Sequence, residues 1–259
     1  MKKEKIGCVV VTYNRKQLLY ECLSALLKQS YPIDEIFLID NASTDGTQSF
    51  LEEKGIIHNK EIINEKEFQY LSYNNLTKVN YIILNRNIGG AGGFNEGLQR
   101  AIKKDFDWIW LLDDDAEPEI DALEKLLSFK DKNKASFLAP LILNKFSQKP
   151  EFSAHKLKID FLTINEKYIK SNEIIKPIYK LEVNSFVGPL LKKEAVKRVG
   201  SIDTSFFILY DDTDYTYRLF RFYGPGYLIT ESIIYHKTSP DNKIPKWKKL
   251  YGMRNKIRF

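Results

Sequence analysis

The chain has 259 residues, of which 43% are hydrophobic and 13% aromatic, so one domain with a substantial buried core is expected. Its 40 Lys and Arg residues outnumber 34 Asp and Glu residues, and the resulting net charge of +6 suits an anionic partner. The lysines are scattered, and the sequence has no zinc-finger spacing or RRM signature, which argues against nucleic acid. Only Cys8 and Cys22 are present, so neither a disulfide framework nor a thiolate metal site is expected.

The N-terminal residues Met1 to Lys5 are too few and too charged for a signal peptide. No run of about 18 apolar residues, the length needed to cross a bilayer, occurs in the sequence. We therefore expect a cytoplasmic protein that is soluble or attached peripherally to a membrane.

The first half of the chain alternates strand patterns with helical patterns. Ile6–Thr12, Ile36–Ile39, Tyr81–Leu84 and Trp108–Leu112 are apolar runs that predict buried strands. A helical pattern follows the first run, and Gly97–Ile102 is expected within another helix. Strand-helix-strand units of this spacing form parallel sheets with right-handed crossovers and bind ligands at the C-terminal edge. The predicted fold class is therefore α/β, with a mostly parallel central sheet flanked by helices.

The second half is less regular. Pro118 is expected to stop a strand, and Glu117–Phe129 to form a helix. The lysine-rich stretch Lys145–Leu181 is expected to contain strands and loops, and Lys193–Val199 a helix. The segment Lys243–Phe259 mixes basic and aromatic residues, which is compatible with an interfacial helix on an anionic membrane or with a helix packed on the domain. The chain ends inside this pattern, which leaves a truncation of the helix open.

Polar clusters follow each of the four predicted strands, as a nucleotide site at the edge of an open sheet requires. They are Thr12-Tyr13-Asn14-Arg15, the segment 40–47, the segment 85–94 and Asp113-Asp114-Asp115. Taken alone, residues 43–47 are more simply a turn with a helix cap. Asp40 ends a buried strand and could accept hydrogen bonds from a base or ribose. The joint occurrence of the four clusters favours the nucleotide site.

Gly89, Gly90, Gly92 and Gly93 precede a predicted helix and indicate either close backbone approach to a ligand or unusual dihedral angles. The pattern lacks the Gly-Lys-Ser/Thr ending of a P-loop and does not reproduce the dinucleotide fingerprint. We expect a loop here, with no side chains to collide with a bound ligand.

Two carboxylate clusters and one histidine could carry chemistry. Three adjacent aspartates at 113–115 repel one another, and hard oxygen ligands suit Mg²⁺ or Mn²⁺, although an acidic turn capping a helix gives the same pattern. In Asp211-Asp212-Thr213-Asp214, one carboxylate could act as a general base, cap a helix that runs to Phe222, or do both. His236 follows a predicted strand and could be a third metal ligand or an ordinary structural histidine.

Nearly the whole chain resembles a family 2 glycosyltransferase of the GT-A fold. Residues 10–15 (VVTYNR) and 39–47 (IDNASTDGT) look like its nucleotide motifs, and Asp113-Asp114-Asp115 looks like its DXD element. Residues 87–94 (NIGGAGGF) and 207–212 (FILYDD) look closest to bacterial galactofuranosyltransferases, with rhamnosyltransferases next. The resemblance implies a single Rossmann-like nucleotide-sugar-binding domain at 1–242, with a nucleotide-binding half (1–115), an acceptor-binding half (116–242) and a helical tail at 243–259.

The resemblance also implies a UDP-sugar donor, Mn²⁺ or Mg²⁺, and inversion at the anomeric carbon by direct displacement. The residues it assigns to the metal are Asp113, Asp115 and His236. Those assigned to the nucleotide are Thr12, Asn14, Arg15, Asp40, Arg86, Asp113 and Asp114, and those assigned to the donor sugar are Gly89, Gly90, Gly92 and Gly93. Asp212 would deprotonate the acceptor hydroxyl, with Asp211 beside it. Tyr210 and Thr213-Asp214 depart from the galactofuranosyltransferase pattern and leave the acceptor and linkage open.

The expected function is transfer of galactofuranose from UDP-galactofuranose to a hydroxyl of a lipid-linked saccharide, in bacterial cell-surface polysaccharide synthesis. Attachment to the inner face of the cell membrane would then bring enzyme and acceptor together. The alternatives are a rhamnosyltransferase that uses dTDP-rhamnose and a non-catalytic module that binds a nucleotide-sugar.

Overall fold

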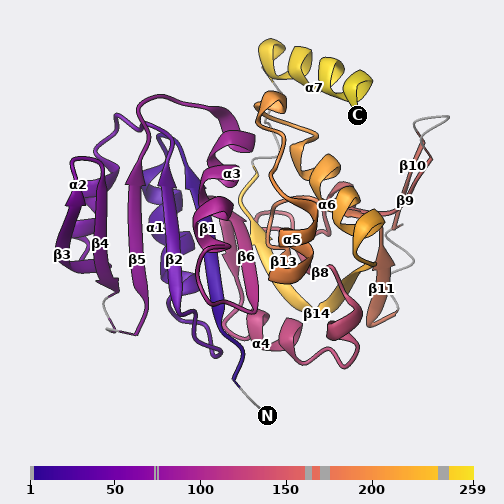
Figure 1. Ribbon diagram of the computed structural model, residues 1–259, viewed down its shortest axis with the longest axis horizontal. Helices are drawn as coiled ribbons and strands as arrows, with labels where there is room; N and C mark the ends of the chain where they lie inside the picture. The colour runs from indigo at the N-terminus through magenta and orange to yellow at the C-terminus, as the bar shows by residue number, and fades with distance from the viewer. Residues whose placement is uncertain (1–2, 73, 75, 161–164, 170–175, 239–244) are drawn as a thin grey trace.

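A computed structural model describes residues 3–72, 74, 76–160, 165–169, 176–238 and 245–259. A twisted sheet runs through the molecule, with four parallel strands at its centre (Figure 1). In spatial order these are β6 (Trp108–Asp113), β1 (Ile6–Thr12), β2 (Glu35–Asp40) and β5 (Lys78–Ile83). Every residue of β1 and β2 is buried, because helices cover both faces of the sheet.

The flanks of this parallel centre contain antiparallel pairings, together with one parallel pair, β8 and β14. On one side the sheet continues through the hairpin β4 (Glu67–Ser72) and β3 (Ile57–Asn64). On the other side it continues through β13 (Leu190–Lys192), β8 (Phe137–Asn144), β14 (Gly226–His236) and β11 (Ile178–Leu181), and β7 (Ala116–Pro118) pairs with β14. A separate small sheet contains β10 (Asn165–Tyr168), β9 (His155–Asp160) and β12 (Val183–Asn184). The predicted α/β class is confirmed, and the sheet is mixed, with parallel strands at its centre.

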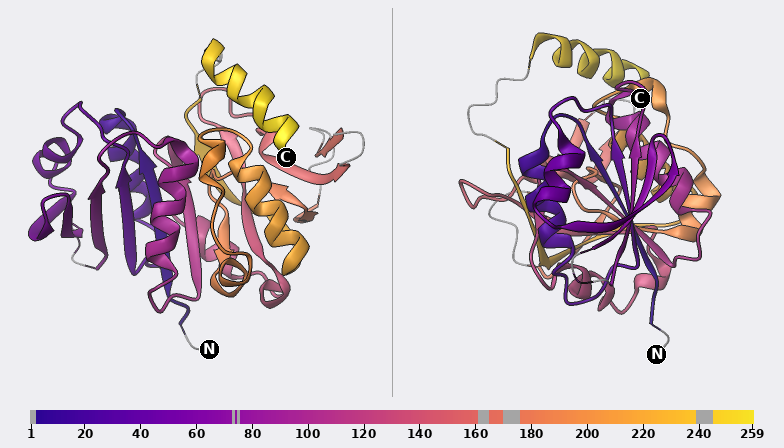
Figure 2. Two further views of the ribbon diagram at one scale, coloured as in Figure 1. Left: turned by 45° about the horizontal axis from the view of Figure 1, so that its top comes forward. Right: turned by 90° about the vertical axis from the view of Figure 1, so that its left-hand side faces the viewer.

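Helices pack on both faces of the sheet, so the molecule has three layers (Figures 1 and 2). On one face lie α1 (Lys16–Leu26), α2 (Thr47–Glu53) and α4 (Ala122–Leu127), and on the other α3 (Gly89–Ala101), α5 (Lys193–Val199) and α6 (Asp211–Phe222). Alternation along β1 supplies both cores, because Cys8 and Val10 face the first layer while Val9 and Val11 face the second. Three short 3₁₀ helices, η1 (Lys132–Lys134), η2 (Phe152–Ala154) and η3 (Thr204–Phe206), connect these elements within the described residues.

Helix α7 (Lys246–Arg258) lies beyond the C-terminal edge of the central strands, above α3 and the start of α6 in Figure 1 and in the left view of Figure 2. It covers most of the predicted tail helix, and Lys243 and the following isoleucine lie outside the described residues. None of the helices that the structure describes is both long and apolar enough to cross a membrane.

Helix α3 begins at Gly89, so the glycine run forms the first turns of the helix and not the expected loop. The helix packs closely on β1. A Cβ atom at Gly93 would lie 2.6 Å from Cγ1 of Val11, and one at Gly97 would lie 2.3 Å from Cγ1 of Val9. These glycines therefore let the helix approach the strand.

The expected helix at Glu117–Phe129 is wrong in its first third. Residues 116–118 pair with β14 as the short strand β7, with Pro118 opposite Ile234. Pro118 is compatible with this strand because a proline that donates no hydrogen bond is tolerated at the edge of a sheet. A turn then leads into α4, which spans only Ala122–Leu127.

Candidate active site

A cavity of about 650 Å³ opens at the C-terminal edge of the central strands. It is lined by residues from loops and elements that are far apart in the chain. From the first half these include Thr12, Arg15, Asn41, Gly89, Gly90, Asp113, Asp114 and Asp115, and from the second half Ser185, Asp211, Asp212, His236, Trp247 and Lys248. Both predicted carboxylate clusters and the predicted histidine therefore face one cavity.

Asp114 connects the end of β6 to the loop after β1. Its Oδ2 accepts a hydrogen bond of 2.8 Å from the Thr12 hydroxyl, and its Oδ1 lies 3.1 Å from Nη1 of Arg15. The same Arg15 nitrogen lies 2.9 Å from Oδ2 of Asp115. Burial raises the pKa of Asp114 to about 6, although the Arg15 charge and the Thr12 hydrogen bond oppose this rise. Thr12 and Arg15 thus hold two of the three aspartates in place.

Asp115 contacts His236, which ends β14. Nε2 of His236 lies 3.3 Å from Oδ1 of Asp115, and its Nδ1 lies 2.6 Å from Oε2 of Glu151. Glu151 also accepts hydrogen bonds from Asn144 and Thr238, which fix its orientation. Burial lowers the pKa of His236, but the two carboxylates outweigh this effect and raise it to about 10.

Asp113 is the most exposed of the three aspartates and faces the cavity. Burial and the charges of Asp115 and Asp114 raise its pKa to about 7. For Asp115 burial acts in the same direction, but the hydrogen bond and charge of His236 and the charge of Arg15 lower the pKa overall. The cluster therefore concentrates more negative charge than its neighbours neutralise.

The side chains that line the cavity meet some, but not all, of the requirements of a site for a hard divalent cation. In the described part of the chain, no three His, Cys, Asp or Glu side chains come close enough together to form a ready metal site. Asp113 and Asp115 do offer carboxylate oxygens to the same cavity, and oxygen is the ligand that Mg²⁺ and Mn²⁺ prefer. Oδ1 of Asp115 is buried, and its nearest polar partner is the ion pair with Nε2 of His236 at 3.3 Å.

Ser185 also lines this cavity, and its hydroxyl oxygen is buried without a hydrogen-bond partner among the described residues. Buried polar atoms are rarely left unpaired in folded proteins. The Ser185 hydroxyl is therefore a candidate contact for a polar ligand in the cavity.

Asp211 and Asp212 are the first two residues of α6, and Tyr210 occupies the N-cap position that sequence patterns predict for an aspartate. Acidic residues are favoured in this first turn by the helix dipole. Oδ1 of Asp212 accepts a hydrogen bond of 2.6 Å from the backbone amide of Thr213. Burial raises the pKa of Asp212 despite the nearby Lys156 charge, and burial together with the Asp212 charge raises the pKa of Asp211.

The turn that precedes these aspartates has an unusual backbone. Phe207 (φ 63°), Leu209 (φ 66°) and Tyr210 (φ 69°) all have positive φ values. At Phe207 the chain forms a γ-turn of the rare positive-φ kind, closed by a 2.7 Å bond from the Ile208 amide to the Phe206 carbonyl. Each such conformation costs roughly 1–3 kcal/mol and persists only where its surroundings enforce it.

Several predicted nucleotide-binding residues lie beside the cavity rather than on its wall. Asn14 joins two loops, receiving a bond of 2.7 Å from the Thr44 amide. Asp40 is buried, and its oxygens accept hydrogen bonds from the Ser43 amide and the Tyr81 hydroxyl. Arg86 is exposed. Their assignment to the nucleotide stays a prediction.

Of the four predicted glycines of α3, two line the cavity and two pack against other side chains. Gly89 and Gly90 line the cavity, and a Cβ atom at Gly90 would meet nothing within 4 Å. At Gly92 and Gly93, by contrast, a Cβ atom would lie 2.6 Å from side chains of Ile88 and Val11 respectively. The geometry therefore gives these last two glycines a packing role, and only the first two stay candidates for contact with a donor sugar.

Sequence reasoning did not single out some residues that form the site. Asn41 bridges two loops, because its Oδ1 accepts from the Ile88 amide while its Nδ2 donates to the Gly89 carbonyl. Trp247 and Lys248 of α7 reach the cavity from the C-terminal segment. Asn41 stands directly after Asp40, so its place at a strand end was a usable signal, whereas no local pattern points to the residues of α7.

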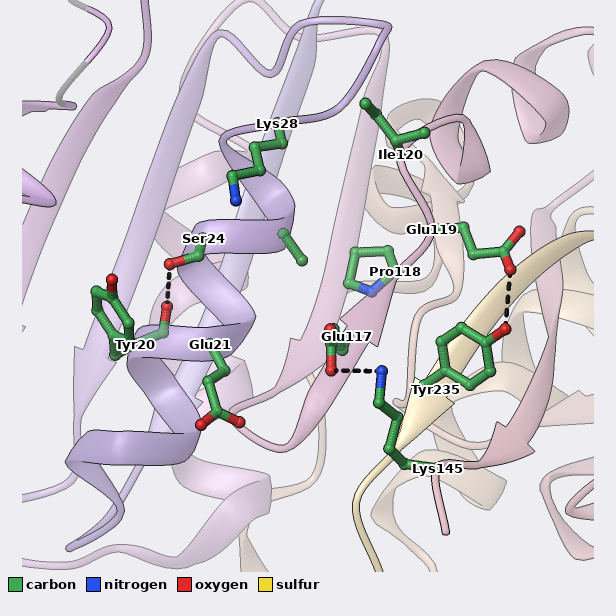
Figure 3. A pocket seen from close by; sticks show the side chains of 11 residues that line it. Tyr20, Glu21, Ser24, Lys28, Glu117, Pro118, Glu119, Ile120, Lys145 and Tyr235 are labelled. Atoms are coloured by element: carbon green, nitrogen blue, oxygen red, sulfur yellow. Dashed lines mark hydrogen bonds and ion pairs between the residues drawn. The ribbon is translucent and has the colours of Figure 1, made fainter. Parts of the chain in front are cut away.

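A second pocket of about 470 Å³ lies between α1 and the β7–β14 pair (Figure 3). Most of its charged groups are already paired. Lys145 lies 3.2 Å from Glu117, and the Tyr235 hydroxyl donates a bond of 3.0 Å to Glu119. None of the predicted site residues lines it, so we assign the chemistry to the larger cavity.

The sequence profile of glycosyl transferase family 2 matches residues 8–200. The chain belongs to this family. This family 2 chain is 27% identical over 226 residues to a galactofuranosyltransferase from Mycolicibacterium smegmatis, covering 84% of the chain and 66% of that protein. It is 26% identical over 204 residues to poly-beta-1,6-N-acetyl-D-glucosamine synthase from Staphylococcus epidermidis, covering 78% of the chain and 42% of that protein.

Solved structures confirm the predicted GT-A fold. The crystal structure of GalNAc-T7 with UDP, GalNAc and Mn²⁺ superimposes with a TM-score of 0.70 at 17% sequence identity, covering 99% of this chain. The family 2 chain spans just under two thirds of the galactofuranosyltransferase and 47% of the GalNAc-T7 chain. At this identity the structural similarity establishes the fold alone.

Proposed function

We propose that the protein transfers galactofuranose from UDP-galactofuranose to a hydroxyl group of a saccharide, with inversion at the anomeric carbon. The observation that carries this proposal is that the carboxylates at 113–115 and those at 211–212 face one cavity in a family 2 fold. The cluster at 113–115 is suited to a cation beside the leaving group, and the cluster at 211–212 to a base beside the acceptor. The similarity to a galactofuranosyltransferase supports this choice of sugar.

We assign Asp113, Asp115 and His236 to a divalent cation, Mn²⁺ or Mg²⁺. His236 would lose a proton when the cation binds, because only a neutral imidazole is a metal ligand. When bound, the cation would supply positive charge opposite the diphosphate. Arg15 and Thr12 orient the aspartates through Asp114, and Glu151 orients His236 through Nδ1. Such carboxylate–histidine contacts commonly fix the ring of a metal-binding histidine.

Asp212 is the proposed general base. Its carboxylate takes the proton of the acceptor hydroxyl as that oxygen forms its bond to the anomeric carbon. The bond from the anomeric carbon to the diphosphate breaks in the same step, and UDP leaves with the electron pair. Asp212 is partly exposed to the cavity, while Asp211 beside it is buried, so Asp212 is the better placed to contact an acceptor.

The acceptor in this proposal is a lipid-linked saccharide at the inner face of the cell membrane, used in bacterial cell-surface polysaccharide synthesis. Trp247, Leu250, Met253 and Ile257 form an exposed apolar stripe along α7, and basic side chains flank it. Helices of this composition bind anionic membranes. Peripheral attachment through α7 would hold the cavity near such an acceptor.

Calorimetric titration with UDP-galactofuranose, UDP-galactose and dTDP-rhamnose, each with Mn²⁺, tests the choice of donor. We expect UDP-galactofuranose to bind most tightly. Tighter binding of dTDP-rhamnose would replace the donor and identify a rhamnosyltransferase. Binding without release of UDP in the presence of saccharide acceptors would indicate a non-catalytic nucleotide-sugar-binding module.

A further inference from the structure

Helix α7 contacts the strained turn at 206–210 through one buried polar side chain. Asn255 has no exposed surface although it lies on a helix whose other face is open to solvent. Its Nδ2 atom lies 2.9 Å from the carbonyl oxygen of Phe206, 2.8 Å from that of Ile208 and 2.8 Å from that of Leu209. A single amide group thus contacts three carbonyls of the turn.

The neighbours of Asn255 on α7 strengthen this contact. Arg254 donates from Nε to the Asn255 Oδ1 at 2.9 Å, which leaves the Asn255 amide nitrogen facing the turn. Arg254 also donates to the Phe206 carbonyl at 2.9 Å. The Tyr251 ring packs on Phe207 with a centroid distance of 5.1 Å.

The opposite side of the turn rests on the N-terminus of α3. The Ala91 amide donates a bond of 3.1 Å to the Phe207 carbonyl. A Cβ atom at Gly89 would lie only 2.1 Å from that same carbonyl oxygen, so the contact is close. The turn is therefore held between α3 and α7, and Asp211 follows it directly.

We propose that Asn255 is a positioning residue, whose side-chain amide holds the turn at 206–210 in its positive-φ conformation and so presents Asp211 and Asp212 to the cavity. The inference rests on the proposed function for its catalytic consequence. An unusual backbone conformation needs surroundings that enforce it, and the Asn255 amide supplies hydrogen bonds that a relaxed turn would not make. Asn255 itself does not line the cavity, and it acts through Asp212.

The variants Asn255→Asp and Asn255→Ala test this role. The first keeps the size of the side chain but replaces the amide donor with an oxygen that faces three carbonyls, and the second removes the contact. We expect kcat for UDP release from UDP-galactofuranose to fall by about a hundredfold, the loss that a displacement near 1 Å can cause. Phe207, Ile208 and Leu209 of this turn line the cavity, but the residues assigned to the nucleotide and the cation lie outside it. The KM for the donor should therefore change far less than kcat, and the Kd for UDP should stay unchanged.

Lys249→Ala is the matched control, since Lys249 lies on the exposed face of the same helix, and it should keep the native kcat. A fall in kcat with an equal loss of UDP affinity would overturn the positioning role, as would native kcat in both Asn255 variants. A merely structural role predicts a lower Tm with proportional loss of all activities, whereas positioning predicts the split between kcat and KM.

Hydrogen exchange decides the question independently of turnover. In the native protein, amides of residues 206–214 should exchange as slowly as those in the middle of α6, and they should exchange faster in Asn255→Asp. Fast exchange in the native protein would overturn the inference even if the variants fail to fold. If the native protein releases no UDP from any donor, the proposed function is wrong. The hydrogen-exchange result would still show whether Asn255 holds the turn in place.

Discussion

Asp212 is the residue on which the proposed chemistry depends most directly. Replacing it with asparagine keeps its size and most of its hydrogen bonding but removes the proton acceptor. We expect Asp212→Asn to lower kcat roughly 10²- to 10⁴-fold, the usual contribution of a general base. UDP affinity in the presence of Mn²⁺ should stay native, as titration calorimetry can measure.

Asp214→Asn is the control for this variant. Asp214 lies on the same turn of α6 but pairs with Arg218 at 2.8 Å and does not line the cavity. It should keep most of the turnover. If Asp212→Asn lost turnover and UDP binding together, Asp212 would be a binding residue and not the base.

Among single residues, the sequence predicts the carboxylates of the site but not the side chains that hold them in position. Asp113 and Asp115 follow a predicted strand, and strand ends meet at one edge of a sheet, so their place at this edge was predictable. Asp212 follows a 3₁₀ helix and a turn, and only the family resemblance placed it in the same site. The contacts of Asn255 were not predictable, because its partners lie 46 to 49 residues earlier in the chain. Long-range hydrogen bonds of this kind leave no local pattern. Whether each site residue has its expected role stays a prediction.

At the scale of elements, helix α3 contains glycines with two different roles. Gly93 packs against β1, whereas Gly90 faces the cavity. Gly93→Ala would bring a methyl group to 2.6 Å from Val11 and should destabilise the fold by roughly 1–3 kcal/mol, as overpacking does. Gly90→Ala meets no atom and improves helix propensity, so its stability should equal or exceed that of the native protein. Urea unfolding measures both.

The variants Gly90→Ala and Gly93→Ala also test the proposed donor-sugar site. Gly90→Ala should weaken binding of UDP-galactofuranose more than binding of UDP, because the added methyl group enters the space proposed for the sugar. Gly93→Ala should bind both ligands normally while it remains folded. Equal donor affinity in Gly90→Ala and the native protein would remove Gly90 from the site.

The positions of strands that are buried on both faces of the sheet were the easiest to predict from the sequence. β1 and β6 are apolar along almost their whole length, and their predicted positions agree with the structure. The β3–β4 hairpin was not predicted, because most of β3 is exposed and carries no alternating pattern. β7 was missed for a different reason, since the pairing of residues 116–118 depends on β14, more than 110 residues later.

For the whole molecule, α7 connects the cavity with the exposed apolar stripe that we propose as a membrane-attachment surface. Its inner face carries Asn255, and its outer face carries Leu250 and Ile257, which are 66% and 85% exposed. We expect the native protein to float with vesicles that contain anionic phospholipid, and the variant Leu250→Glu/Ile257→Glu to remain in the dense fraction. Vesicles of phosphatidylcholine alone are the control. Equal flotation of both proteins would exclude this stripe as the attachment surface.

The central claim is that the cavity binds a nucleotide-sugar through a divalent cation held by Asp113 and Asp115. Calorimetric titration of UDP, with Mn²⁺ and with EDTA, into the native protein and Asp115→Ala tests it most directly. We predict that Mn²⁺ strengthens UDP binding to the native protein and has no such effect on Asp115→Ala. Equal UDP affinity with Mn²⁺ and with EDTA in the native protein, or no UDP binding at all, would contradict the account.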